Sequence, residues 1–404
     1  MNDITKYRYA LSLTSQFYFC GLPFRLDTTP KCTLNCLYCF AMSRGGRRTS
    51  RKLICNPHSI NRKLIRSLYE NNRKKDVVEE MLSEHVPIHF GGVSDPFSSA
   101  SATVATKEII RHLSNHDYPV VISTKNTEAF LENDILTMLT QMQNIAVQIS
   151  FNSLDVKKTS LTEPRVPSIT RRLECVETLS KEGIHVIARL QPLFPLTESM
   201  AAEELIPRLG YSGCKHIAVE YLKLPVERNL SLTKRMFDVL NWDGYDLYHK
   251  NGARLVGREW ILPNEYKWIN LQSIIKRIHE YGMTYGSADY GLNHMGDTDC
   301  CCGIDGLPGF DNWFRGNFSN IIRNTKSERL TFNVEDSWFP KGSVKMYINS
   351  NCRLNGDNDV YSYLLHKWNS PGTVNAPDSY LGITWYGDYD SIGNCIYFRE
   401  EELC

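Results

Sequence analysis

The sequence contains no long apolar run and has almost no net charge. None of its hydrophobic stretches approaches the ~20 residues that a membrane-spanning helix needs, so a membrane protein is not expected. Its first residues lack the charged, then apolar, then small pattern of a secretory signal. Lys and Arg number 46 against 45 Asp and Glu, which gives the 404-residue chain a net charge of +1. We therefore expect a cytoplasmic protein whose cysteines are reduced.

The chain also lacks a convincing internal repeat or low-complexity linker. Its composition, 42% hydrophobic and 23% charged, is that of an ordinary globular protein able to bury a substantial core. The length allows one large domain or two ordinary ones.

The small net charge conceals a basic amino-terminal segment. Residues 1–75 contain fifteen Lys and Arg but three acidic residues, a net charge of +12. A basic loop beside a reactive centre would attract a polyanion, so DNA or RNA is a predicted partner. A solvated basic face, or compensation of an anionic cluster, would explain the same charge. The basic residues of the loop at 44–52 are Arg44, Arg47, Arg48, Arg51 and Lys52.

Three of the thirteen cysteines form one motif. Cys32, Cys36 and Cys39 have C-x3-C-x2-C spacing, which fits one corner of a small metal cluster. Structural zinc and ordinary [4Fe–4S] clusters take four protein ligands. The missing fourth ligand would leave one iron open to a substrate molecule. Half of a zinc site, or buried thiols in a tight turn, are the alternative interpretations.

A second group consists of the adjacent Cys300, Cys301 and Cys302. All three cannot easily bind one metal, but two of them could hold a second metal, as an iron–sulfur or zinc site. A radical-quenching thiol is another interpretation, and buried thiols packed as small hydrophobes are a third. Further ligands for a second metal could come from His294, Cys352 and Cys395.

Strands and helices alternate up to about residue 221, which predicts a parallel sheet. Six strands fit an open, partial (β/α)6 barrel with a C-terminal β or α+β extension. We expect a core at 20–225, a barrel extension with the Cys-rich segment at 226–302 and a C-terminal unit at 303–404. The expected strands are 24–28, 87–90, 120–123, 145–150, 184–190 and 217–220, with 283–286, 344–348 and 380–386 less regular; the expected helices are 58–75, 103–116, 129–141, 168–182 and 271–281.

Polar and glycine residues follow several of these strands. Chemistry in such folds lies at the carboxyl ends of the strands, so we expect a site there. The cysteine motif follows the first strand, Gly91 and Gly92 the second, Ser123 the third, and Ser150 and Asn152 the fourth.

Further sequence motifs accompany the three cysteines. In chain order the six stretches are Asp27–Pro30 with the cysteine run, His89–Phe97, Ile122–Lys125, Gln148–Asn152, Glu163–Ser168 and Ala188–Pro192. Their order and spacing resemble the spore-photoproduct-lyase-like branch of the radical SAM superfamily. The resemblance covers about residues 20–225 and does not extend to the C-terminal part.

The resemblance implies that the three motif cysteines hold a [4Fe–4S] cluster whose open iron takes the amino and carboxyl groups of S-adenosylmethionine. Glycine backbone would meet the ammonium group, and hydroxyl, amide and charged side chains would contact ribose or carboxylate. Helix capping and ion pairing within the barrel are the alternative roles. The cofactor-binding residues implied in this way are Tyr38, Gly91, Gly92, Ser123, Ser150, Asn152, Glu163 and Arg189.

The resemblance also implies an activity. Reductive cleavage of S-adenosylmethionine would give a 5′-deoxyadenosyl radical, which abstracts hydrogen from a bound substrate, and a reductant such as flavodoxin or ferredoxin would supply the electron. We expect nucleic acid, modified or repaired, as the substrate. A peptide or small molecule is the alternative, and a non-catalytic metal-stapled binding protein is the rival interpretation.

One departure from the family concerns the hydrogen donor. The lyases that repair thymine-dimer lesions use a cysteine downstream of the cluster motif. No cysteine here has matching surroundings, since Cys55 lies in a different, basic context. Strict lesion repair is therefore not expected.

Overall fold

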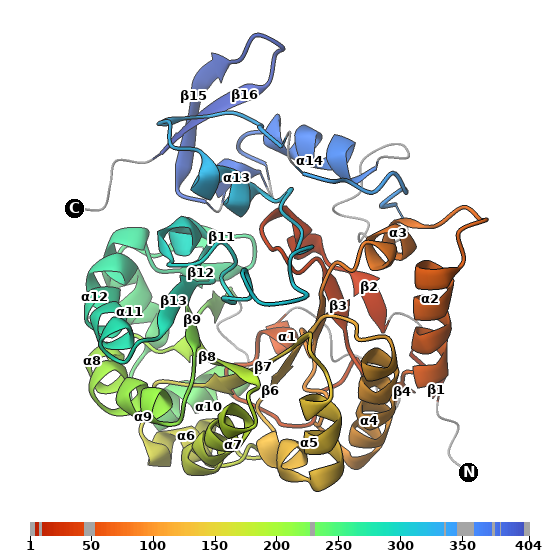
Figure 1. Ribbon diagram of the computed structural model, residues 1–404. Helices are drawn as coiled ribbons and strands as arrows, with labels where there is room; N and C mark the ends of the chain where they lie inside the picture. The colour runs from red at the N-terminus through yellow and green to blue at the C-terminus, as the bar shows by residue number, and fades with distance from the viewer. Residues whose placement is uncertain are drawn as a thin grey trace.

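A sheet of eight strands organises the chain (Figure 1). The computed structural model describes residues 5–7, 10–43, 53–226, 231–334, 337–345, 359–373, 376–379 and 381–399. Seven strands run parallel, and β2 pairs antiparallel with β3 at one edge. In spatial order the strands are β13 (Thr284–Ser287), β9 (His216–Tyr221), β8 (His185–Leu193), β7 (Ile145–Phe151), β6 (Val120–Thr124), β5 (Ile88–Phe90), β3 (Phe24–Leu26) and β2 (Leu11–Leu13).

The central strands are buried on both faces. Every residue of β6 and β7 is buried, because helices cover the outer face and further side chains fill the inner one. The sheet curves into a partial barrel with a ring of helices around it (Figure 1). The helices of the ring are α2 (Pro57–Tyr69), α3 (Val77–Ser83), α4 (Ala100–Asn115), α5 (Asn133–Thr140), α6 (Val156–Thr162), α7 (Ile169–Lys181), α8 (Glu198–Met200), α9 (Ile206–Tyr211) and α12 (Asn264–Glu280).

The lumen of the partial barrel is filled by apolar side chains that are separate from the main core. Val121, Ala146, Ile187 and Ala218 point inward from four successive strands and pack against the segment 300–313. This segment brings Cys300, Cys302, Ile304, Phe310 and Trp313 to the cluster, which also includes Leu22. The barrel therefore has a packed floor, and its carboxyl ends remain for a site.

A small antiparallel sheet and two helices lie between β9 and α12. The sheet has the order β10-β12-β11, and none of these elements was expected from the sequence. Their bounds are β10 (Leu224–Pro225), α10 (Ser231–Leu240), α11 (Gly244–Lys250), β11 (Arg254–Val256) and β12 (Glu259–Ile261).

The C-terminal part forms an α+β unit. It packs against the segment between β2 and β3, at the edge of the sheet. There the hydroxyl groups of Tyr18 and Tyr363 lie 2.8 Å apart and their rings stack. In Figure 1 this unit lies above the barrel. Its elements are α13 (Phe318–Asn324), β14 (Arg329–Leu330), α14 (Val360–Trp368), β15 (Ile383–Tyr389) and β16 (Cys395–Arg399), with sheet order β14-β16-β15.

The predicted architecture is confirmed: a partial parallel barrel with a C-terminal α+β extension. The strand expected at 283–286 is β13, which extends the sheet beyond six parallel strands. No helix within the described ranges is long and apolar enough to cross a membrane. Part of the strand expected at 344–348 lies outside the described residues.

The prediction of one helix at 58–75 is wrong at the carboxyl end of that range. α2 stops at Tyr69, and a new helix begins after Asp76. The Asp76 side chain accepts from the backbone of Glu79, whose side chain accepts from the backbone of Asp76, so a capping box starts α3. Similarly, the helix expected at 129–141 divides into a 3₁₀ turn, Thr127–Leu131, and α5.

Candidate active site

The three motif cysteines lie on the loop that follows β3 and enters α1 (Phe40–Ser43). Asn35 adopts a left-handed conformation with φ of 57°, which asparagine tolerates better than most residues. The backbone N–H of Cys39 donates to the carbonyl of Cys36 at 3.2 Å. This local turn brings the second and third cysteines of the motif together.

Hydrogen bonds from distant segments hold the cysteine loop. The backbone N–H of Leu37 donates to the carbonyl of Thr162 at 2.9 Å, at the end of α6. The guanidinium of Arg165 donates to the carbonyl of Thr33 at 3.2 Å, and the Thr33 hydroxyl donates to the carbonyl of Ser98. The loop is therefore fixed on two sides by the segments that follow α6 and β5.

A buried charge network lies directly behind this loop. The Tyr38 hydroxyl donates to Oε1 of Glu163, which is also 3.0 Å from Nζ of Lys125. The second oxygen of Glu163 accepts from Arg172 at 2.8 Å. The Lys125 ammonium also lies 5.3 Å from the centroid of the Tyr38 ring. Two cations and one phenol thus surround a single carboxylate.

This network sets the ionisation of Glu163. Burial alone would raise the pKa of its carboxyl, but the charges of Arg172 and Lys125 outweigh burial and lower the pKa to about 2. Burial and the neighbouring carboxylate hold the pKa of Tyr38 well above its ordinary value. Glu163 is therefore a stable anion, and Tyr38 is a fixed hydrogen-bond donor.

Gly91 follows β5 in a conformation with φ of +94°. A Cβ atom at this position would lie 2.3 Å from the carbonyl oxygen of Ser123 and 2.9 Å from Pro96, so only glycine fits. At Gly92 the nearest heavy atom to a built Cβ, on Arg25, would be 3.5 Å away. The first glycine is required by close packing, whereas at the second a Cβ would make only ordinary contacts with Arg25 and His89.

Asp27 fixes the loop that carries these glycines. Its Oδ1 accepts from the backbone N–H groups of Val93 and Ser94, at 2.9 and 3.0 Å. The carboxyl is 1% exposed. Burial raises its pKa above the ordinary value, and the two hydrogen bonds offset only part of that rise. Asp27 thereby connects the end of β3 to the segment after β5.

Ser123 belongs to a polar chain across the sheet. Its hydroxyl donates to Oε1 of Gln148 at 2.7 Å, so its oxygen can accept from Nε2 of His89, also at 2.7 Å. Burial, followed by the charge of Arg189, lowers the pKa of His89 to about 3. His89 is therefore a neutral imidazole at physiological pH.

These elements surround one cavity of about 520 Å³ at the carboxyl ends of the parallel strands. The volume is in the range of small-molecule sites. Most of the predicted site residues line it, namely Cys32, Cys36, Cys39, Tyr38, Gly91, Gly92, Ser123, Ser150 and Arg189.

Asn152 and Glu163 do not line this cavity. Asn152 is fully buried, and its Oδ1 accepts from the backbone of Leu154 at 3.0 Å and from the Thr159 hydroxyl at 2.8 Å. Asp95 lines the cavity, but its carboxylate accepts from the backbone of Phe97 and Lys125. The side chains of Asn152 and Glu163 therefore lie behind the cavity wall, where they hold neighbouring segments by hydrogen bonds and ion pairs.

The thiol positions test which metal the motif can hold. One zinc ion with thiolates about 2.3 Å away would bring the sulfur atoms within about 3.8 Å of one another. Within the described ranges, the sulfurs of Cys32, Cys36 and Cys39 are not all within 4.8 Å of one another. At least one pair of these sulfurs is therefore farther apart than direct binding of all three to one zinc ion requires, and a three-cysteine donor set suits a cluster with one open iron.

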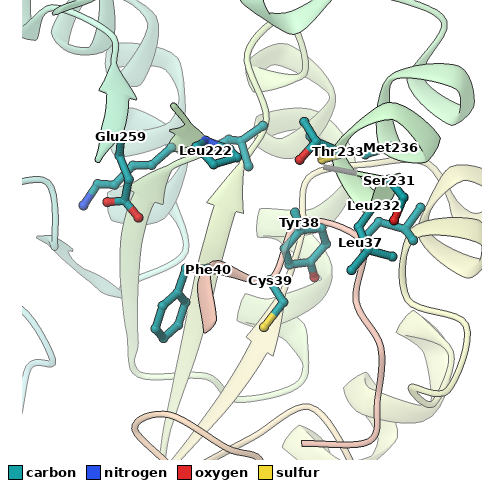
Figure 2. A pocket seen from close by; sticks show the side chains of 12 residues that line it. Leu37, Tyr38, Cys39, Phe40, Leu222, Ser231, Leu232, Thr233, Met236 and Glu259 are labelled. Carbon is teal, nitrogen blue, oxygen red and sulfur yellow. The ribbon is translucent and has the colours of Figure 1, made fainter. Parts of the chain in front are cut away.

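A second, smaller cavity of about 80 Å³ lies beside Tyr38 and Cys39. Figure 2 shows these two residues on one wall, with Leu232 and Met236 of α10 on another. Glu259 of β12 also contributes to both cavities. The elements inserted after β9 therefore form part of the wall of the site.

The adjacent cysteines lie elsewhere, in the barrel floor. Cys300 and Cys302 are buried, and the carbonyl of Cys301 accepts from Nε2 of His216 at 3.0 Å. Cys395 is on β16, and Cys352 lies outside the described residues, as do the basic residues from Arg44 to Lys52. In the described part of the chain, no three of these cysteines bring their sulfurs within 4.8 Å.

Several supporting residues were not expected from the sequence. Arg172 had a detectable signal, because it lies on the buried stripe of α7 with Ile169, Leu173 and Val176, where an unpaired charge would be costly. Asp27 also had one, since it directly follows a strand. Glu163 and Tyr38 were both expected as site residues, but their pairing had no signal in the sequence, because they are 125 residues apart.

The fold is similar to that of spore photoproduct lyase. A variant of that radical SAM enzyme with bound AdoMet and dinucleoside spore photoproduct has a TM-score of 0.53 and 15% identity, covering 69% of this chain and 80% of that chain. The enzyme complexed with dinucleoside spore photoproduct has a TM-score of 0.51 and 16% identity, covering 68% and 79%. No family model and no curated protein matches the sequence. The family resemblance inferred from six motifs is thus confirmed for the fold.

Proposed function

We propose that this chain is a radical SAM enzyme that binds a [4Fe–4S] cluster and S-adenosylmethionine. One observation carries the proposal: three cysteines and a glycine-lined loop face the same cavity at the carboxyl ends of parallel strands. Ser123, Ser150 and Arg189 add polar groups from three successive strands to that cavity. When bound and reduced, the cluster would supply the electron that cleaves S-adenosylmethionine into methionine and a 5′-deoxyadenosyl radical.

The chain's own residues provide positioning. The cysteine loop is held by Thr162, Arg165 and the Tyr38–Glu163 contact, so that its thiols face the cavity as one set. The loop at 91–94 is held by Asp27 and lines the cavity. Arg189 offers a guanidinium, which can pair with a carboxylate of the cofactor. Such pre-organisation is the protein's part in cofactor chemistry.

For the substrate we propose nucleic acid, which the cofactor-derived radical would modify or repair. The net charge of +12 in residues 1–75 supports this class, because clustered positive charge attracts a polyanion. Arg25, which belongs to this segment, lines the cavity itself. The spore photoproduct lyase structures contain a dinucleoside, which is consistent with a nucleotide-sized substrate in this fold. A flavodoxin or ferredoxin would supply the electrons.

The chemical proposal is tested by anaerobic reconstitution with iron and sulfide, followed by dithionite and S-adenosylmethionine. We expect 5′-deoxyadenosine to form with the parent chain and with Cys55→Ala, which removes a buried thiol outside the motif. Cys36→Ala should lose both the product and the paramagnetic signal of the reduced cluster. Equal product from Cys36→Ala and the parent would overturn the radical mechanism.

The substrate proposal needs a separate measurement. Single-stranded and double-stranded DNA and RNA are added to mobility-shift and 5′-deoxyadenosine assays at two salt concentrations. We expect binding that weakens as salt rises, together with faster cofactor cleavage. If no nucleic acid binds while a peptide or small molecule stimulates cleavage, the substrate class is wrong and the radical chemistry stands.

A further inference from the structure

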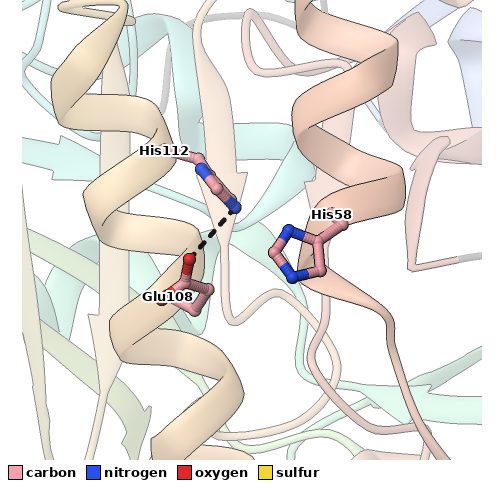
Figure 3. A group of neighbouring side chains, drawn as sticks. All are labelled: His58, Glu108 and His112. Atoms are coloured by element: carbon pink, nitrogen blue, oxygen red, sulfur yellow. Dashed lines mark ion pairs between the residues drawn. The ribbon is translucent and has the colours of Figure 1, made fainter.

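Three side chains with metal-binding atoms meet between α2 and α4, away from the cavity (Figure 3). His58 comes from the first turn of α2, and Glu108 and His112 are one turn apart on α4. One ligand atom from each of the three lies within 4.8 Å of the other two. In Figure 3 the imidazole of His58 faces the other two side chains across the gap between the helices.

The most buried member of this group has no ordinary partner. Only 8% of the surface of His112 is exposed, and within the described part of the chain its Nε2 has no hydrogen-bond partner. This atom lies 3.4 Å from Oε1 of Glu108.

The carboxylate is oriented so that one oxygen remains on the side of the imidazole. Arg111 contacts Oε2 of Glu108, whereas Oε1 faces His112. A buried imidazole nitrogen beside a carboxylate oxygen is an arrangement that a cation between the two would stabilise. The third side chain, His58, is exposed, and its ring centroid lies 5.7 Å from that of His112.

The donor set selects the kind of ion. Two imidazoles and one carboxylate are typical zinc ligands, and with bonds of 2.0–2.1 Å their atoms would be about 3.3 Å apart. The His112–Glu108 distance of 3.4 Å already matches that spacing. Magnesium and calcium prefer oxygen ligands and fit this set poorly. We propose that His58, Glu108 and His112 bind one Zn²⁺ ion, with water in the fourth position.

The position of this site separates it from the large cavity. None of its three residues lines the large cavity, so the ion would not take part in chemistry there. It would join α2, the first helix after the basic segment at 44–52, to α4 on the outside of the barrel. The ion would therefore hold α2 in place independently of the iron–sulfur cluster.

The test uses full-length, cluster-loaded protein, so that the motif cysteines are occupied. The chain is equilibrated anaerobically with buffered Zn²⁺, desalted and analysed for zinc, and its melting temperature is compared with and without the ion. Cobalt is used as an optical probe, because nitrogen and oxygen ligation lacks the thiolate charge-transfer bands of a cysteine site. The variants are His58→Asn, Glu108→Gln and His112→Ala.

The matched control is His116→Asn. His116 also joins the two helices, through Asn61 at 3.0 Å, but is not in the ligand group. We expect one zinc ion and a raised melting temperature for the parent and for His116→Asn, and the loss of both in His58→Asn and Glu108→Gln. No zinc retained by the parent, or equal zinc in parent and His58→Asn, would overturn the proposal. So would zinc that is lost only when Cys301 and Cys302 are replaced by serine.

Discussion

Arg172 and Glu163 form an ion pair with 2.8 Å between Nη2 and Oε2, and their side chains are at most 1% exposed. The same arginine donates to the carbonyl of Ser150 at 2.7 Å, at the end of β7. The same carboxylate accepts from Tyr38 on the cysteine loop. This pair therefore connects the loop of the proposed cluster to a central strand and to α7.

Replacing Arg172 with leucine should destabilise the fold strongly. The change leaves a buried carboxylate without its main partner, a loss of about 3–5 kcal/mol for pairs of this kind. Urea unfolding measures the effect, and the iron content after reconstitution should fall as well. The neighbouring Arg171 is the control, because its pairs with Glu128 and Glu174 are exposed. Arg171→Leu should leave the unfolding midpoint close to that of the parent.

Glu163 should make the fold sensitive to acid. Its folded-state pKa of about 2 is below the ordinary 4.5, so the unfolded chain binds the proton first as pH falls. The contribution is fully present above about pH 4.5 and disappears as pH approaches 2, amounting to roughly 3 kcal/mol. The difference in unfolding free energy between parent and Glu163→Gln should therefore shrink between pH 5 and 3. A constant difference would contradict this assignment.

The two glycines after β5 should respond differently to the same change. Gly91→Ala places a methyl group against the Ser123 carbonyl at a positive φ, which costs on the order of 1–3 kcal/mol in strain before the clash is added. Gly92→Ala meets nothing closer than 3.5 Å and should fold normally. Its methyl group would narrow the space beside the loop and weaken S-adenosylmethionine binding. Melting temperature and equilibrium dialysis separate the two effects.

Asp27 should act on the cofactor through the loop it holds. Asp27→Ala leaves the backbone N–H groups of Val93 and Ser94 without their acceptor, at about 1–3 kcal/mol for each buried group. We expect lower stability and weaker S-adenosylmethionine binding. Asp27→Asn keeps an acceptor oxygen and should restore most of both. Binding equally weak in the two variants would point to the charge rather than the hydrogen bonds.

The barrel could be predicted because its signals are local. Runs such as Ile145–Phe151 are apolar throughout, as expected for strands covered on both faces, and the cysteines, glycines and serines follow strand ends. The cavity brings these residues together because the carboxyl ends of parallel strands meet at one edge. Nine of the eleven predicted site residues line it for this reason.

What the sequence does not encode locally could not be predicted. Asn152 follows a strand end and Glu163 follows α6, yet the side chains of both turn away from the cavity, to a hydroxyl and to charges supplied by other segments. The break after Tyr69 depends on a capping box at Asp76, which competes with a continuous apolar stripe. The insertion at 224–261 has short strands that are stable only by packing on the barrel, so its pattern is weak.

The packed floor of the barrel limits how molecules can enter and leave the cavity. Trp313, Phe310 and Ile304 fill the amino-terminal end beneath the inward residues of four strands. Among the described residues, this packing closes the amino-terminal end, and the cysteine loop and the insertion at 224–261 line the cavity at the opposite end. If the proposed cofactor and substrate both reach the cavity from that end, the molecule that binds deeper would have to bind before the other and dissociate after it.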